Sequence, residues 1–468
     1  MASTITNTVR AAGPEVRRSE IVARAETAGL RLVRFLYCDN DGIIRGKATG
    51  IAGLKDRLET GIGLTVAMQA FTMLDHLASV EGMGPVGEFR LVPDPDTFVV
   101  LPYVPHSAMM LCDMLTLERQ PWEACPRTFL KRMVASAAQM GMVMQAAVEH
   151  EFYLARATPS GYEPFDRSLC FSSVGFDASA HIMDDIIAAL EQQGIQVEQF
   201  MPELGPGKQE LSIHHAETLR AADNALLVRE TVRGVALQHD VIASFAAKPF
   251  LDQAGSGAHI HCSLWGAPDS PHAGANLLFD PKGGGGVSQM GFHFIGGVLA
   301  HLPALVALTC ASPNSYRRLV PHFWSSAYTA YGFDNREGAI RIPSPFWGRE
   351  AESTNLELKP VDHSSNPYLA MGGLLAAGLD GIRRQLNPGE PVDIDPGNFS
   401  DAERAQRGIQ RLPTSLDAAL DALQADTVLT EALGPLLTSS YVAVKRLESR
   451  YFADKPPEEE ARQHFAKY

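Results

Sequence analysis

Two hydrophobic periodicities alternate along the chain, and they predict short runs of helix and strand. Apolar residues that recur every three or four positions indicate amphipathic helices, whereas apolar residues at every second position indicate half-buried strands. On this basis we expect helices at 15–28, 51–60, 128–141, 184–193, 218–239, 290–308, 366–385, 416–423 and 440–452. We expect strands at 30–38, 43–48, 89–92, 97–101, 143–154, 195–203, 208–213, 241–247, 255–263, 338–343 and 355–359.

The order of these elements predicts an α+β fold. Residues 39–42 carry a hairpin turn signal between two strands, and a helix and further strands follow them. At 468 residues the chain is too long for one small core, so two domains of unequal size are expected. The predicted division is a tail and helix at 1–28, a small module at 29–115 and a larger domain at 116–468.

A pair of histidines stands in the strand predicted at 255–263. His259 and His261 are two positions apart, so their imidazoles point to the same face of the strand. Imidazoles held in this way can bind a divalent metal or polarise a phosphate, but two ordinary strand histidines would show the same pattern.

Carboxylates repeat this arrangement on other strands. Glu149 and Glu151 share one face of the strand at 143–154, which is typical either of a solvated face or of a buried pair that binds a metal. Glu203 and Glu210 flank a tight turn that can bring them together across a hairpin, and Glu357 lies on a further alternating strand. These acids and His259 could not be buried together unpaired, whereas two Mg²⁺ or Mn²⁺ ions would satisfy them and leave positions for substrate oxygens.

Cationic residues gather in the C-terminal half of the sequence. Arginine side chains bind phosphates and carboxylates in a bidentate manner, although any one of them alone could be a surface residue. The glycine run at 283–286 lacks the Gly-Lys-Ser/Thr ending of a phosphate-binding loop. The pattern therefore predicts ATP-dependent phosphoryl chemistry without such a loop. The cationic residues are Arg317, Arg318, Arg336, Arg341 and Lys359.

Composition narrows the class of protein. With 45% hydrophobic and 20% charged residues, the chain has the composition of a soluble globular protein. A net charge of −14 argues against nucleic acid or an anionic membrane surface as the main partner. The six cysteines are scattered without a Cys-x-x-Cys pair, as expected in a reducing cytoplasm. We also expect no segment long and apolar enough to cross a bilayer.

Taken in order, these segments resemble the glutamine synthetase family from about residue 30 to 452. Each segment alone is a weak signal, but the complete ordered set is highly specific. The matching segments are 93–97, 149–152, 203–210, 248–249, 255–263, 314–319, 335–336, 341–343 and 357–368.

The resemblance implies an N-terminal β-grasp domain and a catalytic domain built on a curved antiparallel sheet with flanking helices. It implies ATP as co-substrate, and a homo-oligomer, usually a dodecamer of two stacked hexameric rings with active sites between subunits. Carried over by position, Glu151, Glu203 and Glu210 would hold one metal, and Glu149, His259 and Glu357 the other. His261, Ser263, Arg336 and Arg341 match ATP-binding positions, Ala254, Gly255, Arg318 and Lys359 match glutamate-binding positions, and Arg318 and Arg336 match catalytic positions.

The family reaction phosphorylates the γ-carboxylate of glutamate, and an amine then displaces the phosphate. Ammonia-using members carry an acidic residue where this chain has Trp324, and a second acid in a loop that here corresponds to 61–67 and has none. Losing both carboxylates removes the attraction for a small cation, whereas an aromatic ring offers apolar or cation–π contact to a larger alkylammonium. Ala254, Lys359 and Lys208 also replace the usual Asn, Arg and Gln, which bears on the acid substrate.

The departures favour a ligase that joins glutamate to an organic amine, namely a monoamine, diamine, polyamine or aromatic amine. One alternative is a ligase that uses ammonia despite Trp324. The other is a non-catalytic ring-forming relative, which the retention of all six candidate metal ligands disfavours.

Overall fold

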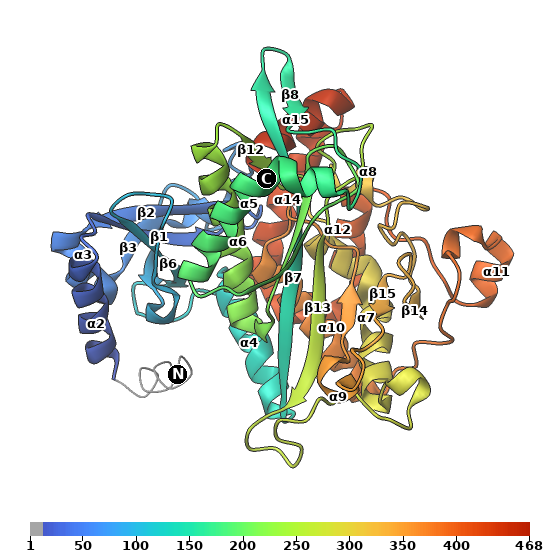
Figure 1. The fold of residues 1–468 in the computed structure, drawn as a ribbon. Helices are drawn as coiled ribbons and strands as arrows, with labels where there is room; N and C mark the ends of the chain where they lie inside the picture. The colour runs from blue at the N-terminus through green and yellow to red at the C-terminus, as the bar shows by residue number, and fades with distance from the viewer. Residues whose placement is uncertain (1–12) are drawn as a thin grey trace.

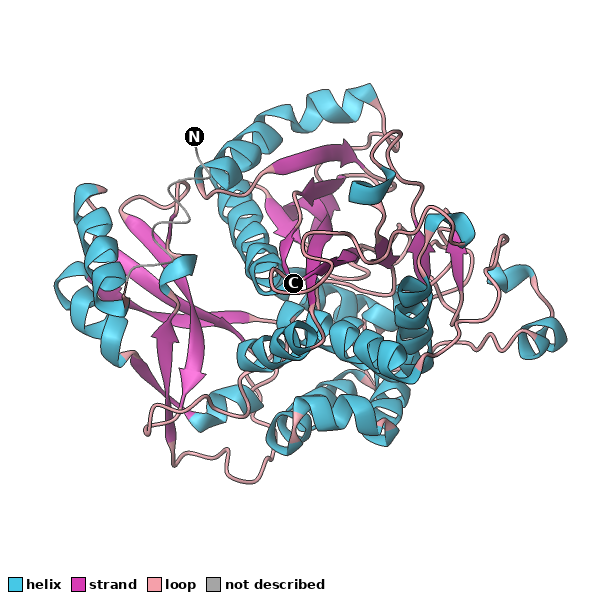
Figure 2. Ribbon diagram, turned by 90° about the horizontal axis from the view of Figure 1, so that it is seen from below, coloured by secondary structure: helices cyan, strands magenta, loops and turns pink. Residues whose placement is uncertain are grey.

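The computed structural model describes residues 13–468, so the predicted tail at 1–12 lies outside the described residues. The chain forms two groups of strands with helices packed around them (Figures 1 and 2). The first group is a six-stranded sheet of order β2-β1-β6-β4-β3, in which β5 pairs with β6. Its strands are β1 Leu32–Cys38, β2 Ile44–Gly50, β3 Ile62–Thr65, β4 Glu88–Pro93, β5 Val99–Val100 and β6 Ser107–Leu115.

The central strand β6 of this sheet was not predicted. It runs parallel to β1 and antiparallel to β4, and almost all of its residues are buried. Five consecutive residues at its centre, 108–112, are apolar, so it lacks the alternation that identifies a half-buried strand. The predicted hairpin β1–β2 is confirmed.

The second group is a ten-stranded sheet of order β14-β15-β16-β13-β7-β10-β9, with β8, β11 and β12 also paired to β7. All its pairs are antiparallel except β14–β15, which is parallel. The sheet is therefore mixed, whereas a wholly antiparallel sheet was expected. The predicted α+β class is confirmed. The strands are β7 Met142–Thr158, β8 Gly161–Pro164, β9 Val197–Pro202, β10 Lys208–Ile213, β11 Ala216–Glu217, β12 Ile242–Ser244, β13 Ala258–Gly266, β14 Tyr331–Phe333, β15 Ile340–Ile342 and β16 Leu356–Leu358.

Helices α4, α6, α7 and α10 form the layer behind this sheet, with α4 and α6 against β7 and with α10 against α7. The larger helices are α2 Pro14–Thr27, α3 Ile51–Thr60, α4 Pro126–Gln139, α5 Ser173–Gln192, α6 Thr218–Gln238, α7 Gln289–Thr309, α10 Pro367–Arg384, α12 Leu416–Ala425, α13 Thr427–Leu433, α14 Pro435–Phe452 and α15 Pro457–Lys467. The short ones are α8 Ser315–Arg318, α9 Glu350–Ser353 and α11 Asp401–Gln406. Helix α15 was not predicted, and α5 begins at Ser173, well before the predicted 184. The domain boundary at 115 stays a prediction.

The expectation that no segment is long and apolar enough to cross a bilayer is wrong for α7. By length and composition this helix passes such a test, but 72% of its apolar window is buried inside the fold. It packs against α10 and α12, and it contains Pro303. Its apolar surface is therefore explained by the core of the larger domain.

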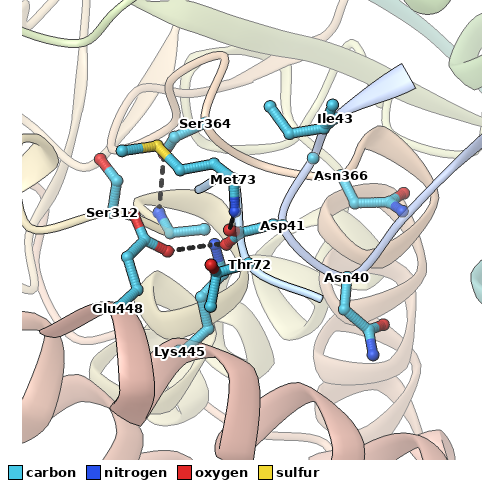
Figure 3. Close-up of polar contacts among 12 residues, drawn as sticks. Asn40, Asp41, Ile43, Thr72, Met73, Ser312, Ser364, Asn366, Lys445 and Glu448 are labelled. Atoms are coloured by element: carbon cyan, nitrogen blue, oxygen red, sulfur yellow. Dashed lines mark hydrogen bonds and ion pairs between the residues drawn. The ribbon is translucent and has the colours of Figure 1, made fainter. Parts of the chain in front are cut away.

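The β1–β2 turn joins the two parts of the molecule. The side-chain amide of Asn366, at the start of α10, donates to the carbonyls of Cys38 and Asp39 at 3.1 and 2.9 Å. Asp41 in the same turn forms an ion pair with Lys445 of α14, and Lys445 also pairs with Glu448 at 3.3 Å. Figure 3 shows the two carboxylates converging on the lysine. We call Asp41, Lys445 and Glu448 the joint cluster.

Candidate active site

The register of the large sheet brings the predicted acids and histidines to one face. Glu210 of β10 stands opposite Glu151 of β7, and Glu149 stands opposite His259 of β13. One step further along the sheet, His261 stands opposite Glu357 of β16, and Glu357 stands opposite Arg341 of β15. The residues between them, such as Val148, Leu211, Ile260 and Leu358, point to the other face and form the core with the helices.

These side chains form two compact groups that share Glu149. The ligand atoms of Glu149, Glu151 and His259 lie within 4.8 Å of one another, and so do those of Glu149, His261 and Glu357. His259 Nδ1 donates to the carbonyl of Lys359 at 2.9 Å, because a carbonyl oxygen can only accept. This bond directs Nε2 toward Glu151 Oε1 at 3.2 Å.

The contact between His259 and Glu151 fits a cation. Burial lowers the pKa of His259, so the ring is neutral near pH 7 and its Nε2 carries a lone pair. That lone pair faces a carboxylate oxygen at 3.2 Å, and two acceptors at this distance repel unless a cation or a proton lies between them. The chemistry of this donor set therefore fits a divalent metal ion.

Negative charge exceeds positive charge in this part of the sheet. Lys208 pairs with Glu151 at 2.6 Å, Lys359 pairs with Glu357 at 3.2 Å, and Arg341 also pairs with Glu357. Burial, and then the charges of Glu149, Glu151 and Glu203, raise the pKa of Glu210 to about 9. A carboxyl group with such a pKa holds a proton at neutral pH unless a cation replaces that proton.

Glu203 lies at the end of β9, in the turn that leads to β10. Its backbone N–H donates to the carbonyl of Lys208 at 3.0 Å, and its Oε2 lies 3.7 Å from Cys170 Sγ. Glu203 and Glu210 interact electrostatically, as the hairpin prediction requires, but neither belongs to the two compact groups. The predicted division of six ligands between two metals stays a prediction.

Glycines before β13 make room for Arg318. A Cβ at Gly255 would lie 2.7 Å from Arg318 Cγ, and a Cβ at Gly257 would lie 2.6 Å from His259 Nε2. Arg318 is buried and donates to the carbonyl of Val361 at 3.1 Å. The glycines thus permit an arginine to lie beside the acidic face. Burial raises the pKa of Glu151, but Lys208, then His259 and then Arg318 outweigh it and hold that pKa well below its usual range.

The remaining predicted site residues surround this face. Ser263 lies two residues beyond His261 on β13, and its hydroxyl accepts a hydrogen bond from the Trp265 indole N–H at 2.8 Å. The carbonyl of Ala254 accepts a hydrogen bond from the Tyr153 hydroxyl at 2.7 Å. Arg336 forms no ion pair within residues 13–468, and its guanidinium carbon lies 6.0 Å from the Trp324 ring centroid.

Trp324 belongs to a loop at 322–326 in an unusual backbone conformation. His322, Trp324 and Ser326 have φ values of 65°, 54° and 66°, in the left-handed region that side chains other than glycine rarely adopt. Hydrogen bonds hold this loop: His322 to Asp395 at 2.6 Å, and Ser326 to the carbonyl of Gly338 at 2.9 Å. Trp324 is 60% exposed, so it is available to a ligand.

Two contacts were missed by sequence reasoning. Lys208 was noted only as a replacement, yet its ammonium lies inside the acidic cluster. Glu337 was not singled out, yet it is buried and its Oε1 accepts a hydrogen bond from the Trp324 backbone N–H at 2.7 Å. Glu337 lies between Arg336 and Arg341 in the sequence, two arginines that match family positions, and this placement could have identified it as a candidate site residue.

Comparison with known families and relatives accounts for nearly the whole chain. Residues 123–464 match the catalytic domain of glutamine synthetase, and residues 17–122 match its N-terminal domain. The gamma-glutamylpolyamine synthetase of Streptomyces coelicolor is 37% identical over 437 residues, which cover 92% of each chain. The glutamine synthetase of Methanosarcina mazei is 31% identical over 438 residues, covering 92% of this chain and 94% of the relative.

Solved structures have the same fold. A crystal structure described as a novel glutamine synthase homolog has a TM-score of 0.83 and 34% identity, and covers 94% of this chain and 99% of its own. A GmaS–ADP complex has a TM-score of 0.82 and 29% identity, with 94% and 98% coverage. The chain belongs to the glutamine synthetase family of ligases.

Proposed function

We propose that this ligase uses ATP to activate the γ-carboxylate of glutamate and condenses it with an organic amine, releasing ADP and phosphate. The observation that carries the choice of amine is the exposed indole of Trp324 in the loop at 322–326, where ammonia-using members have an acid. The similarity to a gamma-glutamylpolyamine synthetase supports the same choice.

We assign the acidic face of the sheet to two divalent cations, Mg²⁺ or Mn²⁺. The proposed ligands are Glu151, Glu203 and Glu210 for one cation and Glu149, His259 and Glu357 for the other. When bound, such cations supply charge neutralisation for the phosphoryl group that is transferred. The raised pKa of Glu210 and the facing lone pairs of His259 and Glu151 support this assignment.

The proposed ATP-binding residues lie along β13 and β15. His261, Ser263 and Arg341 share the acidic face of neighbouring strands, and Arg336 has no ion pair within the described chain to satisfy its charge. A guanidinium without a carboxylate partner suits the oxygens of a triphosphate, which it can bind in a bidentate manner.

We assign the segment from Ala254 to Gly255, together with Arg318 and Lys359, to glutamate. A carboxylate oxygen of glutamate attacks the terminal phosphorus of ATP, and ADP leaves with the bridging oxygen. The amine nitrogen then attacks the resulting acyl phosphate, the C–O bond to phosphate breaks, and the nitrogen loses a proton. Arg318 and Arg336 would stabilise the negative charge that develops on the transferred phosphate.

An amine panel tests this proposal directly. The protein is incubated with ATP, Mg²⁺ and glutamate, and phosphate release is measured with ammonia, methylamine, ethylamine, putrescine, spermidine or aniline as the nucleophile. We expect at least one organic amine to exceed ammonia in kcat/KM. The products are identified by mass spectrometry, which separates amide formation from simple ATP hydrolysis.

The alternatives make different predictions in the same assay. A true glutamate–ammonia ligase would work at least as well with ammonia as with any amine. A non-catalytic relative would release no phosphate with any of them. A Trp324→Glu variant provides a matched test, because restoring a carboxylate should raise the activity with ammonia relative to the best amine.

We further propose that the protein assembles into two stacked hexameric rings with active sites between subunits. The part of the chain that the structure describes exposes large apolar side chains next to the β9–β10 turn, including Leu169, Phe171 and Leu204. Clusters of exposed apolar side chains mark association surfaces. Sedimentation velocity would distinguish a dodecamer from a single ring or a monomer.

A further inference from the structure

The carboxylate of Glu337 is buried, but the described chain leaves it only partly satisfied. The residue is 5% exposed, and the hydrogen bond of its side chain within the described residues is the one that Oε1 accepts from Trp324 N–H at 2.7 Å. No lysine or arginine in residues 13–468 forms an ion pair with it. Its other oxygen, Oε2, accepts no hydrogen bond from the described residues and is not sealed from solvent, so it is available to a cation.

The groups around Glu337 give it little positive charge. His322 and Lys359 are near enough to favour its ionised form, but Asp395 opposes them. His322 is itself bonded to Asp395 at 2.6 Å, and Lys359 to Glu357 at 3.2 Å. Burial, the largest effect, raises the pKa of Glu337, so an incoming cation would relieve a real desolvation cost.

Its position ties Glu337 to Trp324. The residue follows Arg336, whose guanidinium lies 6.0 Å from the Trp324 ring centroid, and its carboxylate is bonded to the backbone of that same tryptophan. Ser326 is bonded to the carbonyl of Gly338, the next residue. The loop at 322–326 and the segment at 335–338 are therefore bonded to each other, and the Glu337 carboxylate meets Trp324 at its backbone N–H.

We propose that the free oxygen of Glu337 binds the ammonium group of the incoming amine, with the Trp324 indole against its carbon chain. This inference rests on the proposed organic-amine activity. An alkylammonium needs a carboxylate for its charged end and an apolar or π surface for its carbons, and Glu337 and Trp324 offer these two chemistries. Ammonia-using members have an acid at the position of Trp324. In this chain Glu337, on a neighbouring segment, would supply the carboxylate instead.

A Glu337→Gln variant separates binding from simple loop support. The glutamine carbonyl can still accept the hydrogen bond from Trp324 N–H, so the loop keeps its anchor while the charge is lost. We expect kcat/KM for a cationic alkylamine such as ethylamine to fall by roughly tenfold to a hundredfold, mainly through KM. The KM values for ATP and glutamate should remain within about twofold of the wild type.

Hydroxylamine serves as the uncharged nucleophile in the same assay. At about pH 8 hydroxylamine is mostly neutral, whereas alkylamines are protonated like lysine. We expect Glu337→Gln to change hydroxylamine turnover by less than about threefold, because no ammonium needs to be bound. Glu431→Gln, an exposed position on α13, removes one charge elsewhere and should change neither reaction.

Two results would overturn the inference. Unchanged alkylamine kinetics in Glu337→Gln would show that its charge does not bind the amine. An equal loss with ethylamine and hydroxylamine, at an unchanged melting temperature, would show that Glu337 only supports the loop. Wild-type protein that uses ammonia and no organic amine would instead contradict the proposed function itself, so the two failures are distinguishable.

Discussion

The joint cluster and the acidic face both bury several carboxylates, but they are neutralised in different ways. In the joint cluster the side chains of Asp41, Lys445 and Glu448 are all 0% exposed. Tyr468 also donates to the backbone carbonyl of Asp41 at 2.7 Å. On the acidic face, Glu149 and Glu210 remain partly exposed.

The two clusters are neutralised differently because solvent reaches one of them and not the other. Burial and then Glu448 raise the pKa of Asp41 to about 7, so near neutral pH a shared proton partly offsets the one excess negative charge of the sealed joint cluster. The acidic face has a larger excess and can be reached from outside, so cations can take the place of protons. A sealed cluster therefore serves to connect parts of the chain, whereas an accessible one can bind ligands.

The largest effect should come from the acidic face. Glu357→Gln keeps the shape of the side chain but removes the charge that pairs with Arg341 and Lys359. We expect kcat to fall by roughly a thousandfold, because a bound metal ion stabilises the charge of the transition state by several kcal/mol in such reactions. Phosphate release and Mn²⁺ titration measure the loss, and unchanged turnover would contradict the metal assignment.

Breaking the joint cluster should affect stability and leave cation binding intact. Lys445→Met would leave Asp41 and Glu448 buried without their cation, so we expect a loss of about 3 kcal/mol in the free energy of unfolding. Urea denaturation measures this loss. The control is Lys131→Met, whose partly exposed pair with Asp113 should contribute less than about 1 kcal/mol. Weaker Mn²⁺ binding in Lys445→Met would mean that the two clusters are coupled.

Divalent cations should stabilise the protein more at high pH than at low pH. Since the pKa of Glu210 is raised from 4.5 to about 9, the metal-free folded state binds more protons than the unfolded chain between these values. Metal-free stability therefore falls as the pH rises through this range. A cation displaces the proton, so its stabilising effect should grow between about pH 6 and about pH 8.5.

Melting temperatures with EDTA and with excess Mg²⁺ measure this effect. At a hundredfold excess over the dissociation constant, we expect a stabilisation of about 2.7 kcal/mol. Glu210→Gln should make the Mg²⁺ effect nearly independent of pH. A stabilisation that decreases with rising pH in the wild type would be the opposite of the expected sign.

The smallest effect concerns Lys208. Its ammonium lies 2.6 Å from Glu151 Oε2 and competes with any cation for that oxygen. Lys208→Gln should therefore strengthen Mn²⁺ binding by roughly tenfold, which corresponds to about 1.4 kcal/mol. Isothermal titration calorimetry measures the change. Weaker binding in the variant would indicate that Lys208 positions Glu151 for the metal.

Sequence reasoning succeeded where one face of an element differs clearly from the other. The alternation in β7, β10 and β13 predicted that Glu151, Glu210 and His259 would share a face, and the register of the sheet brings them together. It failed at β6, whose residues are buried on both faces, and at the membrane test for α7, which a core helix also passes.

The sequence by itself determined the α+β class, the family and the common orientation of the acids, because side-chain direction repeats with the period of a strand. Only the tertiary structure decided that Lys208 enters the acidic cluster, that Glu337 reaches the backbone of Trp324, and that Asp41 meets Lys445. Contacts of this kind join residues whose separation along the chain carries no periodic signal. They arise from strand register, loop conformation and the packing of distant elements.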